Sequence, residues 1–519
     1  MKRRKIYLLL SVIVLTITVI VFSCKKSALN TSDPNNLNTI TYYKTAAQLK
    51  AGVNAIYAVI HQNNLVSREW YYLHDTRSDE VAPGGGQLEA ARLQLYNNTD
   101  DPTNPVMNSV WNGWYTAIFR ANVVTDNAAN VTDNVADAKE SVGEAKFLRA
   151  WAYFDLVSMW GGVPLVTSVP KTVTDFKPRA TVAAVYAQIV QDLTDAAAVL
   201  PGKSGTDQGR ATASAANAML GRVYMQQGNF AAAKAAFLKI PTTGADGYSL
   251  TARYLDNFEL ATEFNKESIF EIVFVDKGDN GYNWGGESST EEQSTVRNQE
   301  YCPVAWRNLI PSNKYLNEFE NTATGAAKTD PRFSYSVYQS GDLYNNGQST
   351  LTDADQNGNP SVLNGVTKKI SWRKFMIIYQ ESASTASFHP GGNNQRIIRY
   401  SEILLDLAEC ANEAGDIGGA VAYLNMVRAR QDVAMPPYPT AQFPVASKSD
   451  VVKAIMHEKM VELGDEELRN IDILRWRKAG YFAKEPIASF KAGRDELLPI
   501  PQAEIDNNPL LKGQQNPGY

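Results

Sequence analysis

Two stretches of this chain, 187 positions apart, carry the same six-position pattern of large and small residues. An internal repeat constrains a fold strongly, because each copy is one structural unit. Small residues let two helices approach each other, large residues fill the groove between them, and a glycine permits a tight turn. The first copy consists of Leu220, Gly221, Tyr224, Gly228, Ala233 and Phe237, and the second of Leu407, Ala408, Ala411, Gly415, Ala420 and Leu424.

This spacing is typical of tetratricopeptide (TPR) helix pairs. A weaker third copy covers Phe147 to Trp160 and ends at Gly161-Gly162. Stacked pairs bury one continuous core, so we expect a compact helical scaffold and not a string of separate units. The long separation of the two clear copies indicates that the scaffold carries a large insertion.

Hydrophobic periodicity supports a mainly α fold with one irregular middle. Apolar residues recur every three or four positions through most of the chain after residue 45. We therefore predict TPR-like helices over about 45–240 and 398–480, and a loop-rich insertion with short β-strands over about 241–395. The strand-like runs in the insertion are 268–274 and 374–379, separated by Gly, Asn, Ser and Asp clusters. The helical pattern covers roughly 45–61, 108–129, 138–160, 180–199, 213–239, 398–430 and 448–479.

The N-terminus has the pattern of a bacterial lipoprotein signal. Four basic residues at 2–5 precede the apolar run from Ile6 to Phe22, and Ser23-Cys24 follows. We predict a signal peptide over 1–23, lipidation of Cys24, a flexible tether over 24–40 and a single folded domain over 41–519. The alternative is a transmembrane helix, because the run from Ile6 to Phe22 is 17 residues long, at the lower limit for a span. The polar stretch after Cys24 favours the tether.

Composition excludes several classes of protein. Fifty Lys and Arg oppose 55 Asp and Glu, and the net charge of −5 becomes −9 without the basic residues of the signal. A mildly acidic chain without a basic block does not favour nucleic-acid binding. Three cysteines and four histidines are too few for a disulfide framework or a His-rich metal centre. We predict that Cys302 and Cys410 are buried thiols.

Several short motifs, in order along the chain, resemble the SusD/RagB family of Bacteroidetes outer-membrane lipoproteins. They are Cys24, Tyr42 to Leu49, Trp114-Tyr115 with Arg120 to Asn122, Gly143 to Phe154, Gly161 to Leu165, Asp330 to Phe333, Arg399 to Asp406, Leu424 to Arg428, Glu462-Leu463, Glu466 to Trp476, Leu498 to Pro501 and Asn516 to Tyr519. The resemblance implies a non-catalytic lipoprotein, anchored in the outer membrane and exposed on the cell surface. It also implies glycan capture and delivery to a SusC-like TonB-dependent transporter.

Aromatic residues on loops are the candidate ligand contacts. A sugar presents an apolar C–H face that stacks on an aromatic ring, while polar side chains bond its hydroxyls. The resemblance places ligand contacts in the region that contains Arg77, Tyr96 and Asn98, close to the Gly84-Gly85-Gly86 loop. Trp70 and Tyr71, in the same region, favour core packing. In the insertion, the candidates are Tyr282, Trp284 and Trp306. Five tryptophans at helical spacing are expected in the core: Trp111, Trp114, Trp151, Trp160 and Trp476.

One segment of the insertion resembles the opening of a calcium loop. Asp353, Asp355 and Asn357 provide oxygens at alternate positions before Gly358. The twelfth position is Asn364 and not the usual glutamate, so a site would be weak. The alternative is a hairpin turn at Asn357-Gly358. Calcium is the only cofactor for which we find a candidate site.

Enzyme motifs find little support. His457-Glu458 lacks the second histidine of a zinc protease, and Gly84 to Gly86 lacks the residues of a phosphate loop. The acidic run Asp465 to Glu467, followed by Arg469, Arg475 and Arg477, favours a solvated, salt-bridged helix over a glycosidase pair. Three alternatives to a glycan receptor remain: a RagB-like peptide receptor, a TPR scaffold for envelope proteins, and a hydrolase.

Overall fold

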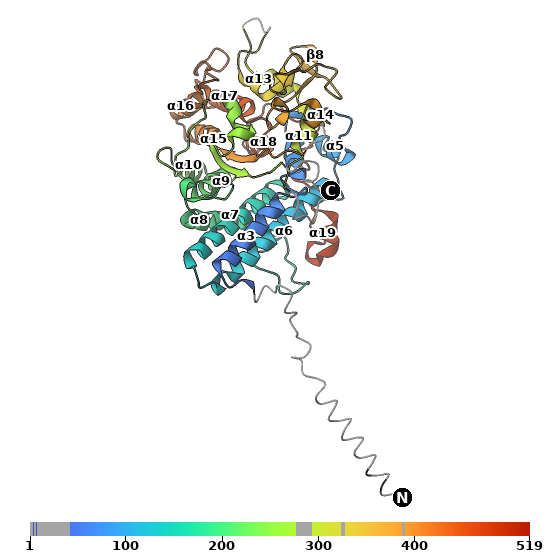
Figure 1. Cartoon of the computed structure of the whole chain (residues 1–519), viewed down its shortest axis with the longest axis vertical. Helices are drawn as coiled ribbons and strands as arrows, with labels where there is room; N and C mark the ends of the chain where they lie inside the picture. The colour runs from blue at the N-terminus through green and yellow to red at the C-terminus, as the bar shows by residue number, and fades with distance from the viewer. Residues whose placement is uncertain (1–3, 5–6, 8–41, 277–292, 323–326, 387–389) are drawn as a thin grey trace.

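The computed structural model describes residues 4, 7, 42–276, 293–322, 327–386 and 390–519 (Figure 1). Apart from Arg4 and Tyr7, the predicted signal peptide lies outside the described residues, as do Cys24 and the site residues Tyr282 and Trp284. Among the residues that are described, no helix has both the length and the apolar character needed to cross a membrane.

The predicted mainly α fold is confirmed. Helices α3, α6, α7 and α8 form one end of the molecule, and α15 to α18 lie beyond α9 and α10 (Figure 1). The longer helices are α3 (Ala46–Ile60), α6 (Pro105–Asn127), α7 (Val135–Trp160), α8 (Val182–Val199), α9 (Ala213–Gln226), α10 (Phe230–Phe237), α15 (Tyr400–Glu413), α16 (Ile417–Arg428), α17 (Lys448–Leu463) and α18 (Arg469–Lys478). Local signals set the helix starts: Thr45 forms a capping box with Gln48 at α3, and the Asn104 side chain caps α6 just before Pro105.

Both clear repeats form helix pairs, as predicted. Helices α9 and α10 pack together, as do α15 and α16, and α10 packs on α15, so the two repeats are neighbours in space. A Cβ atom at Gly221 would lie less than 3.0 Å from the Phe237 ring, so glycine is what allows α9 and α10 to approach. The turn glycines Gly228 and Gly415 have φ angles of +75° and +81°. The weaker copy differs: α7 ends at Trp160, just before Gly161, but its partner α8 begins only at Val182.

The described strands form five antiparallel two-stranded pairs, four of them within the insertion and at its ends. Strand β2 pairs with β10, which leads directly into α15, so this pair joins the two ends of the insertion. The run 268–274 contains β2, as predicted, but the strand predicted at 374–379 is wrong: Phe375 has a φ angle of +61° and Ile377–Tyr379 is a 3-10 turn. The pairs are β1 (Val81–Pro83) with β3 (Leu309–Pro311), β2 (Ser268–Ile272) with β10 (Gln395–Arg399), β4 (Val337–Gln339) with β9 (Ile370–Trp372), β5 (Leu343–Tyr344) with β6 (Ser349–Thr350), and β7 (Ser361–Leu363) with β8 (Val366–Lys368).

Buried ion pairs connect the insertion to the second repeat. Glu267, at the start of β2, accepts hydrogen bonds from Arg399 at 2.8 Å and Arg430 at 2.6 Å. Both arginines also bind Glu462 of α17. Burial opposes ionisation of Glu462, but these arginines hold its pKa at about 2. All four side chains are buried, so removing one would leave an uncompensated charge in the core.

The prediction of a solvated helix at Asp465 to Glu467 is wrong. These residues form the buried turn between α17 and α18, where Asp465 and Glu467 have φ angles of +66° and +57°. Asp465 and Glu467 pair with Arg297 from the insertion, and Glu466 pairs with Lys374 and Arg399. The acidic run therefore holds distant segments together, which its local sequence does not indicate.

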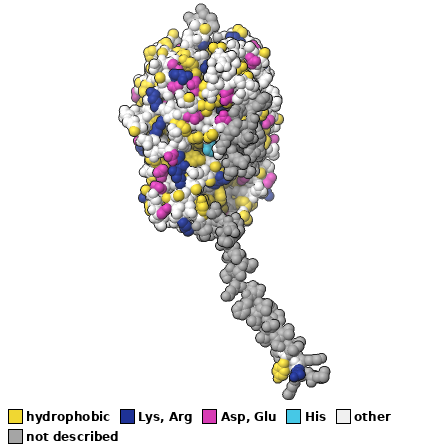
Figure 2. Space-filling model, in the orientation of Figure 1, with side chains coloured by type: hydrophobic (Ala, Val, Ile, Leu, Met, Phe, Trp, Pro, Cys, Tyr) yellow, Lys and Arg dark blue, Asp and Glu magenta, His cyan; other side chains and the backbone are white. Residues whose placement is uncertain are grey.

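The other core predictions are confirmed. Cys302 and Cys410 are free and buried, and the five tryptophans expected in the core are at most 2% exposed. Trp70 and Tyr71 are buried as well. On the face shown in Figure 2, Lys and Arg side chains are interspersed with Asp and Glu.

Candidate functional site

Three loops, distant in sequence, meet where strand β1 ends and strand β3 begins. They are the 84–86, 302–308 and 353–359 loops, and we call them together the loop cluster. The Gly84 amide donates a hydrogen bond to the Asn308 carbonyl at 2.9 Å, and the Asn359 amide donates to the Gly84 carbonyl at 2.8 Å. The loop cluster contains the predicted ligand contact Trp306 and the three candidates of the predicted calcium loop, Asp353, Asp355 and Asn357.

Glycines allow these loops to cross in contact. A Cβ atom on Gly85 would lie less than 3.0 Å from the Trp306 carbonyl oxygen, and one on Gly358 would meet the Gly84 carbonyl equally closely. Gly358 also has a φ angle of +73°. Gly84 and Gly85 therefore allow the backbones of neighbouring loops to pack closely, whereas Gly86 faces open space.

Arg307 connects the loops of the loop cluster through hydrogen bonds. Its buried guanidinium donates to the carbonyls of Asn357, Asn359 and Ile370 at 2.6 to 2.7 Å, and to the Ser371 hydroxyl at 2.6 Å. Four acceptors on two other segments hold the loop from 302 to 308 in one position. Burial lowers the pKa of Arg307 to about 10, which leaves it charged at neutral pH.

Trp306 is half-buried and is held by its backbone. Its amide donates to the carbonyl of Gln299, in the short helix α11 (Arg297–Tyr301), at 3.0 Å. The next residue of α11, Glu300, accepts hydrogen bonds on its carboxylate from Arg68 at 2.6 Å and from Asn308 at 2.6 Å. An aromatic side chain on a rigid backbone can act as a stacking platform, because little ordering is needed when a ligand arrives.

The other predicted contacts lie elsewhere. Arg77 and Asn98 are buried against the C-terminal segment: Arg77 donates to the Asp495 carbonyl at 2.7 Å and Asn98 to the Ser489 hydroxyl at 2.8 Å. The cavity that they line has a volume of only about 10 Å³, room for about one water molecule. Tyr96 ends α5 (Ala90–Tyr96) and is half-buried. The structure therefore does not bring Arg77, Asn98 and Trp306 into one pocket.

Both carboxylates of the predicted calcium loop accept hydrogen bonds within the protein. The Asp353 carboxylate accepts from the Ser340 hydroxyl, and the Asp355 carboxylate accepts from the Thr352 amide and hydroxyl at 2.8 and 2.7 Å. Asn357 donates its amide to the Ala305 carbonyl at 2.7 Å. The nearby hairpin turn is not at Asn357-Gly358, where we placed it, but at Asn364-Gly365 between β7 and β8.

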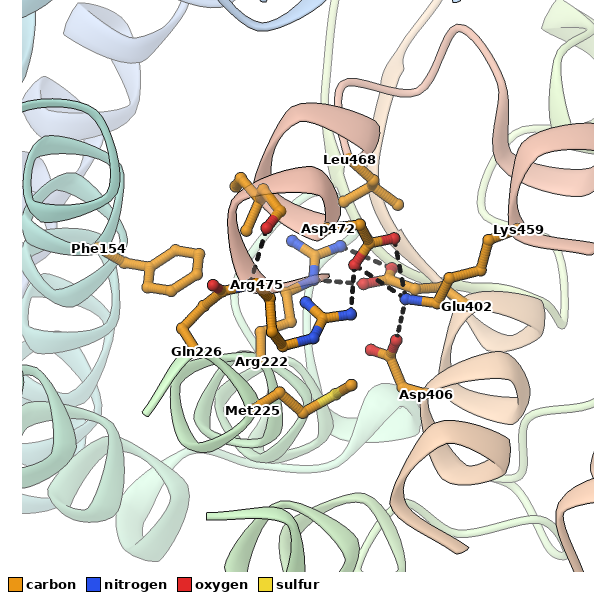
Figure 3. A pocket seen from close by; sticks show the side chains of 11 residues that line it. Phe154, Arg222, Met225, Gln226, Glu402, Asp406, Lys459, Leu468, Asp472 and Arg475 are labelled. Atoms are coloured by element: carbon orange, nitrogen blue, oxygen red, sulfur yellow. Dashed lines mark hydrogen bonds and ion pairs between the residues drawn. The ribbon is translucent and has the colours of Figure 1, made fainter. Parts of the chain in front are cut away.

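A second charged cluster lies between the repeats, where α9, α15, α17 and α18 meet (Figure 3). Lys459 binds Asp406 at 2.5 Å and Asp472 at 3.0 Å, and Arg475 binds Asp472 at 2.6 Å. Burial raises the pKa of Asp406 to about 7, although Lys459 opposes this shift. The space between these side chains is about 20 Å³, so the cluster connects helices and offers no room for a sugar.

Sequence reasoning missed Arg307 as a part of the site, and it assigned Gly358 to a calcium loop or a turn and not to a contact with another loop. Arg307 stands in no motif, and its partners come from residues about 50 to 64 positions away. The three consecutive glycines at 84–86 were a usable signal, because close backbone approach is a common reason for glycine.

Comparisons with known proteins agree with this architecture. The family described as "SusD family" matches residues 266–519, and the family described as "Starch-binding associating with outer membrane" matches residues 29–225. SusD-like protein P2 of Formosa agariphila is 26% identical over 499 residues, which cover 92% of this chain and 94% of that protein.

Solved structures show the same fold. A structure named "Laminarin binding SusD-like protein" is 27% identical, has a TM-score of 0.71, and is matched over 92% of this chain and all of that one. Surface glycan-binding protein A of Bacteroides thetaiotaomicron, solved with laminarihexaose, has a TM-score of 0.69 at 22% identity, with 91% of this chain and 99% of that chain covered. Two successive family matches that together cover most of the sequence, joined to this fold, place the chain in the SusD/RagB family.

Proposed function

We propose that this protein is an outer-membrane lipoprotein that captures an oligosaccharide and delivers it to a SusC-like TonB-dependent transporter. The family description of residues 29–225 names starch binding and outer-membrane association, and a 27% identical relative is named for laminarin binding. Both support carbohydrate as the ligand class. The lipid anchor is Cys24, and the receptor has no catalytic role.

The observation that carries the proposal is Trp306, half-buried on a loop that Arg307 and the 84–86 glycines hold in place. Stacking a sugar on an aromatic face buries part of about 150–250 Å², which would be worth at most about 4–6 kcal/mol at about 25 cal/mol per Å². Association costs oppose this gain. A few such contacts therefore give a Kd of roughly μM to mM, weak enough for the ligand to be handed on.

The geometry also suits a tethered receptor. The described domain begins at Tyr42, at the end formed by α3 and its neighbours, while the insertion lies towards the other end (Figure 1). A tether over 24–40 would leave the insertion clear of the anchored end.

The test is a titration of the chain from residue 25 onward with plant, fungal and host oligosaccharides and with a peptide pool. Heat and tryptophan fluorescence report binding, and product analysis over hours reports turnover. We expect saturable binding of one glycan class without turnover. Binding of peptides alone would favour a peptide receptor, and a response to neither would favour a protein scaffold.

A further inference from the structure

Two adjoining hollows lie on either side of the loop Gln208–Arg210, away from the loop cluster. The larger, of about 280 Å³, is bounded by α3, and the smaller, of about 150 Å³, is bounded by the residues around β2. Both are lined by Gln208, Gly209 and Arg210. We call the two hollows together the 208–210 furrow. It shares no residue with the loop cluster.

An aromatic ring forms a wall of the smaller hollow. Phe264 is half-buried and has a φ angle of +56°, a backbone conformation that a bulky residue rarely adopts. Its ring lies 4.0 Å from the position that a Cβ atom on Gly209 would take. The Phe264 amide donates to the Glu271 carboxylate at 3.0 Å, which fixes this strained residue in place.

Polar groups in the smaller hollow can bond hydroxyls. Tyr248 is 1% exposed, so it forms part of the floor of this hollow, and its hydroxyl lies beside Thr212 and Ser214 and not at the surface. The Lys203 ammonium lies 5.0 Å from the centre of the Tyr248 ring and donates a hydrogen bond to the Asn265 carbonyl at 2.6 Å. The Asp207 carboxylate pairs with Lys50 at 3.2 Å, and because its side chain is 75% exposed a ligand can reach it.

The larger hollow offers neutral and cationic donors that are held in place. Burial lowers the pKa of His61 to about 4, so this ring is neutral at physiological pH. Arg210 is fixed by Glu144 at 2.8 Å and by Asn54 at 2.8 Å. Gly209 has a φ angle of +82°, and a Cβ atom there would lie less than 3.0 Å from the Val273 side chain, so glycine lets this loop pack on Val273 between the two hollows.

We propose that the 208–210 furrow is a second oligosaccharide site, in which one sugar stacks on Phe264 and the next lies beside His61 and Arg210. One aromatic wall surrounded by hydroxyl, carboxylate and ammonium groups matches a ligand with an apolar ring face and many hydroxyls. This inference rests on the proposed function and extends it. Two weak sites on one chain would retain a long glycan better than one, because the second contact becomes intramolecular.

Native mass spectrometry tests this directly, because it counts the oligosaccharides bound to each chain. The probe is laminarihexaose together with the oligosaccharides of the panel. Phe264→Asn removes the ring but keeps a residue that tolerates positive φ, so the fold should be retained. Phe119→Asn is the matched control, because Phe119 is 47% exposed on α6 and lines neither site. Thermal unfolding of each variant checks the fold.

We expect two bound ligands for the wild type and Phe119→Asn, one for Phe264→Asn and one for Trp306→Ala. The wild type could instead bind one ligand, which Trp306→Ala abolishes and Phe264→Asn leaves intact. That result would overturn the proposal of a site in the 208–210 furrow and would leave the proposed function standing. Binding lost only in Phe264→Asn would support the furrow and contradict the role of Trp306. No binding by any chain would overturn both.

Discussion

Gly85 lies so close to the carbonyl oxygen of Trp306 that any side chain at position 85 would collide with it. This contact connects the loop after β1 to the loop that carries the candidate stacking platform. The position of Trp306 therefore depends on a residue more than 200 positions away, and the first prediction follows from that dependence.

Gly85→Ala should destabilise the protein by about 1–3 kcal/mol, because the new methyl group must displace the Trp306 backbone. Glycan affinity should fall as well, because the platform moves. Gly86→Ala is the matched control: its Cβ atom would meet nothing within 4 Å, so its stability should change by less than about 0.5 kcal/mol. Urea denaturation and calorimetry measure the two effects. Equal stability of both variants would contradict the contact.

Gly221→Ala should disturb the first helix pair. The added methyl group collides with the Phe237 ring, and overpacking of about 1–3 kcal/mol exceeds the gain of up to about 1 kcal/mol in helix propensity. Gly418→Ala in α16 meets open space and should be neutral or slightly stabilising. Denaturation midpoints distinguish the two. Adding Phe237→Leu to Gly221→Ala should restore part of the loss.

His457 should make stability depend on alkaline pH. Burial disfavours its charge, but the hydrogen bond to Glu318 at 2.9 Å and the Glu320 carboxylate 3.6 Å away outweigh burial and raise its pKa to about 9 from 6.5. Because the folded pKa is the higher one, the stabilisation is complete below pH 6.5 and is lost as the pH rises through 9. The loss between pH 7 and pH 9.5 should be on the order of 2 kcal/mol.

Urea denaturation over this pH range measures the loss, and His457→Gln should remove it. His61→Gln is the control, because His61 has a folded pKa of about 4 and stays neutral throughout. A wild-type stability that does not fall with pH would contradict the assignment.

The two cysteines of the chain from residue 25 onward should be unreactive in the folded state. Cys302 and Cys410 are buried, and burial raises the pKa of Cys302 to about 12 and that of Cys410 as well. A thiol must ionise to react, so a disulfide reagent at pH 8 should label neither residue until urea unfolds the chain. Rapid labelling in buffer would show that these sites open.

The helical half of the fold could be predicted because its signals are local. Apolar periodicity located α8 and α17, and the repeat around Gly221 predicted contacts between α9 and α10. The acidic residues at 465–467 could not be assigned in this way. Their partners, Arg297 and Lys374, come from the insertion, and a single sequence does not show which distant charges will meet.

The same limit applies to the site. Trp306 could be named because aromatic residues on loops are candidate platforms. Arg77 and Asn98 gave no sign that the C-terminal segment buries them, and the role of Arg307 depends on carbonyls about 50 positions away. Burial by a remote segment is a property of the tertiary fold, and local composition does not report it.

The most direct test of glycan capture through the loop cluster compares Trp306→Ala with Phe119→Ala by calorimetric titration of the best oligosaccharide from the panel. Phe119 supplies the control because it is exposed on α6, outside the loop cluster. We expect at least a tenfold loss of affinity at the loop cluster for Trp306→Ala, no loss for Phe119→Ala, and the same thermal unfolding midpoint for both within a few degrees. Unchanged glycan affinity in Trp306→Ala would contradict the account.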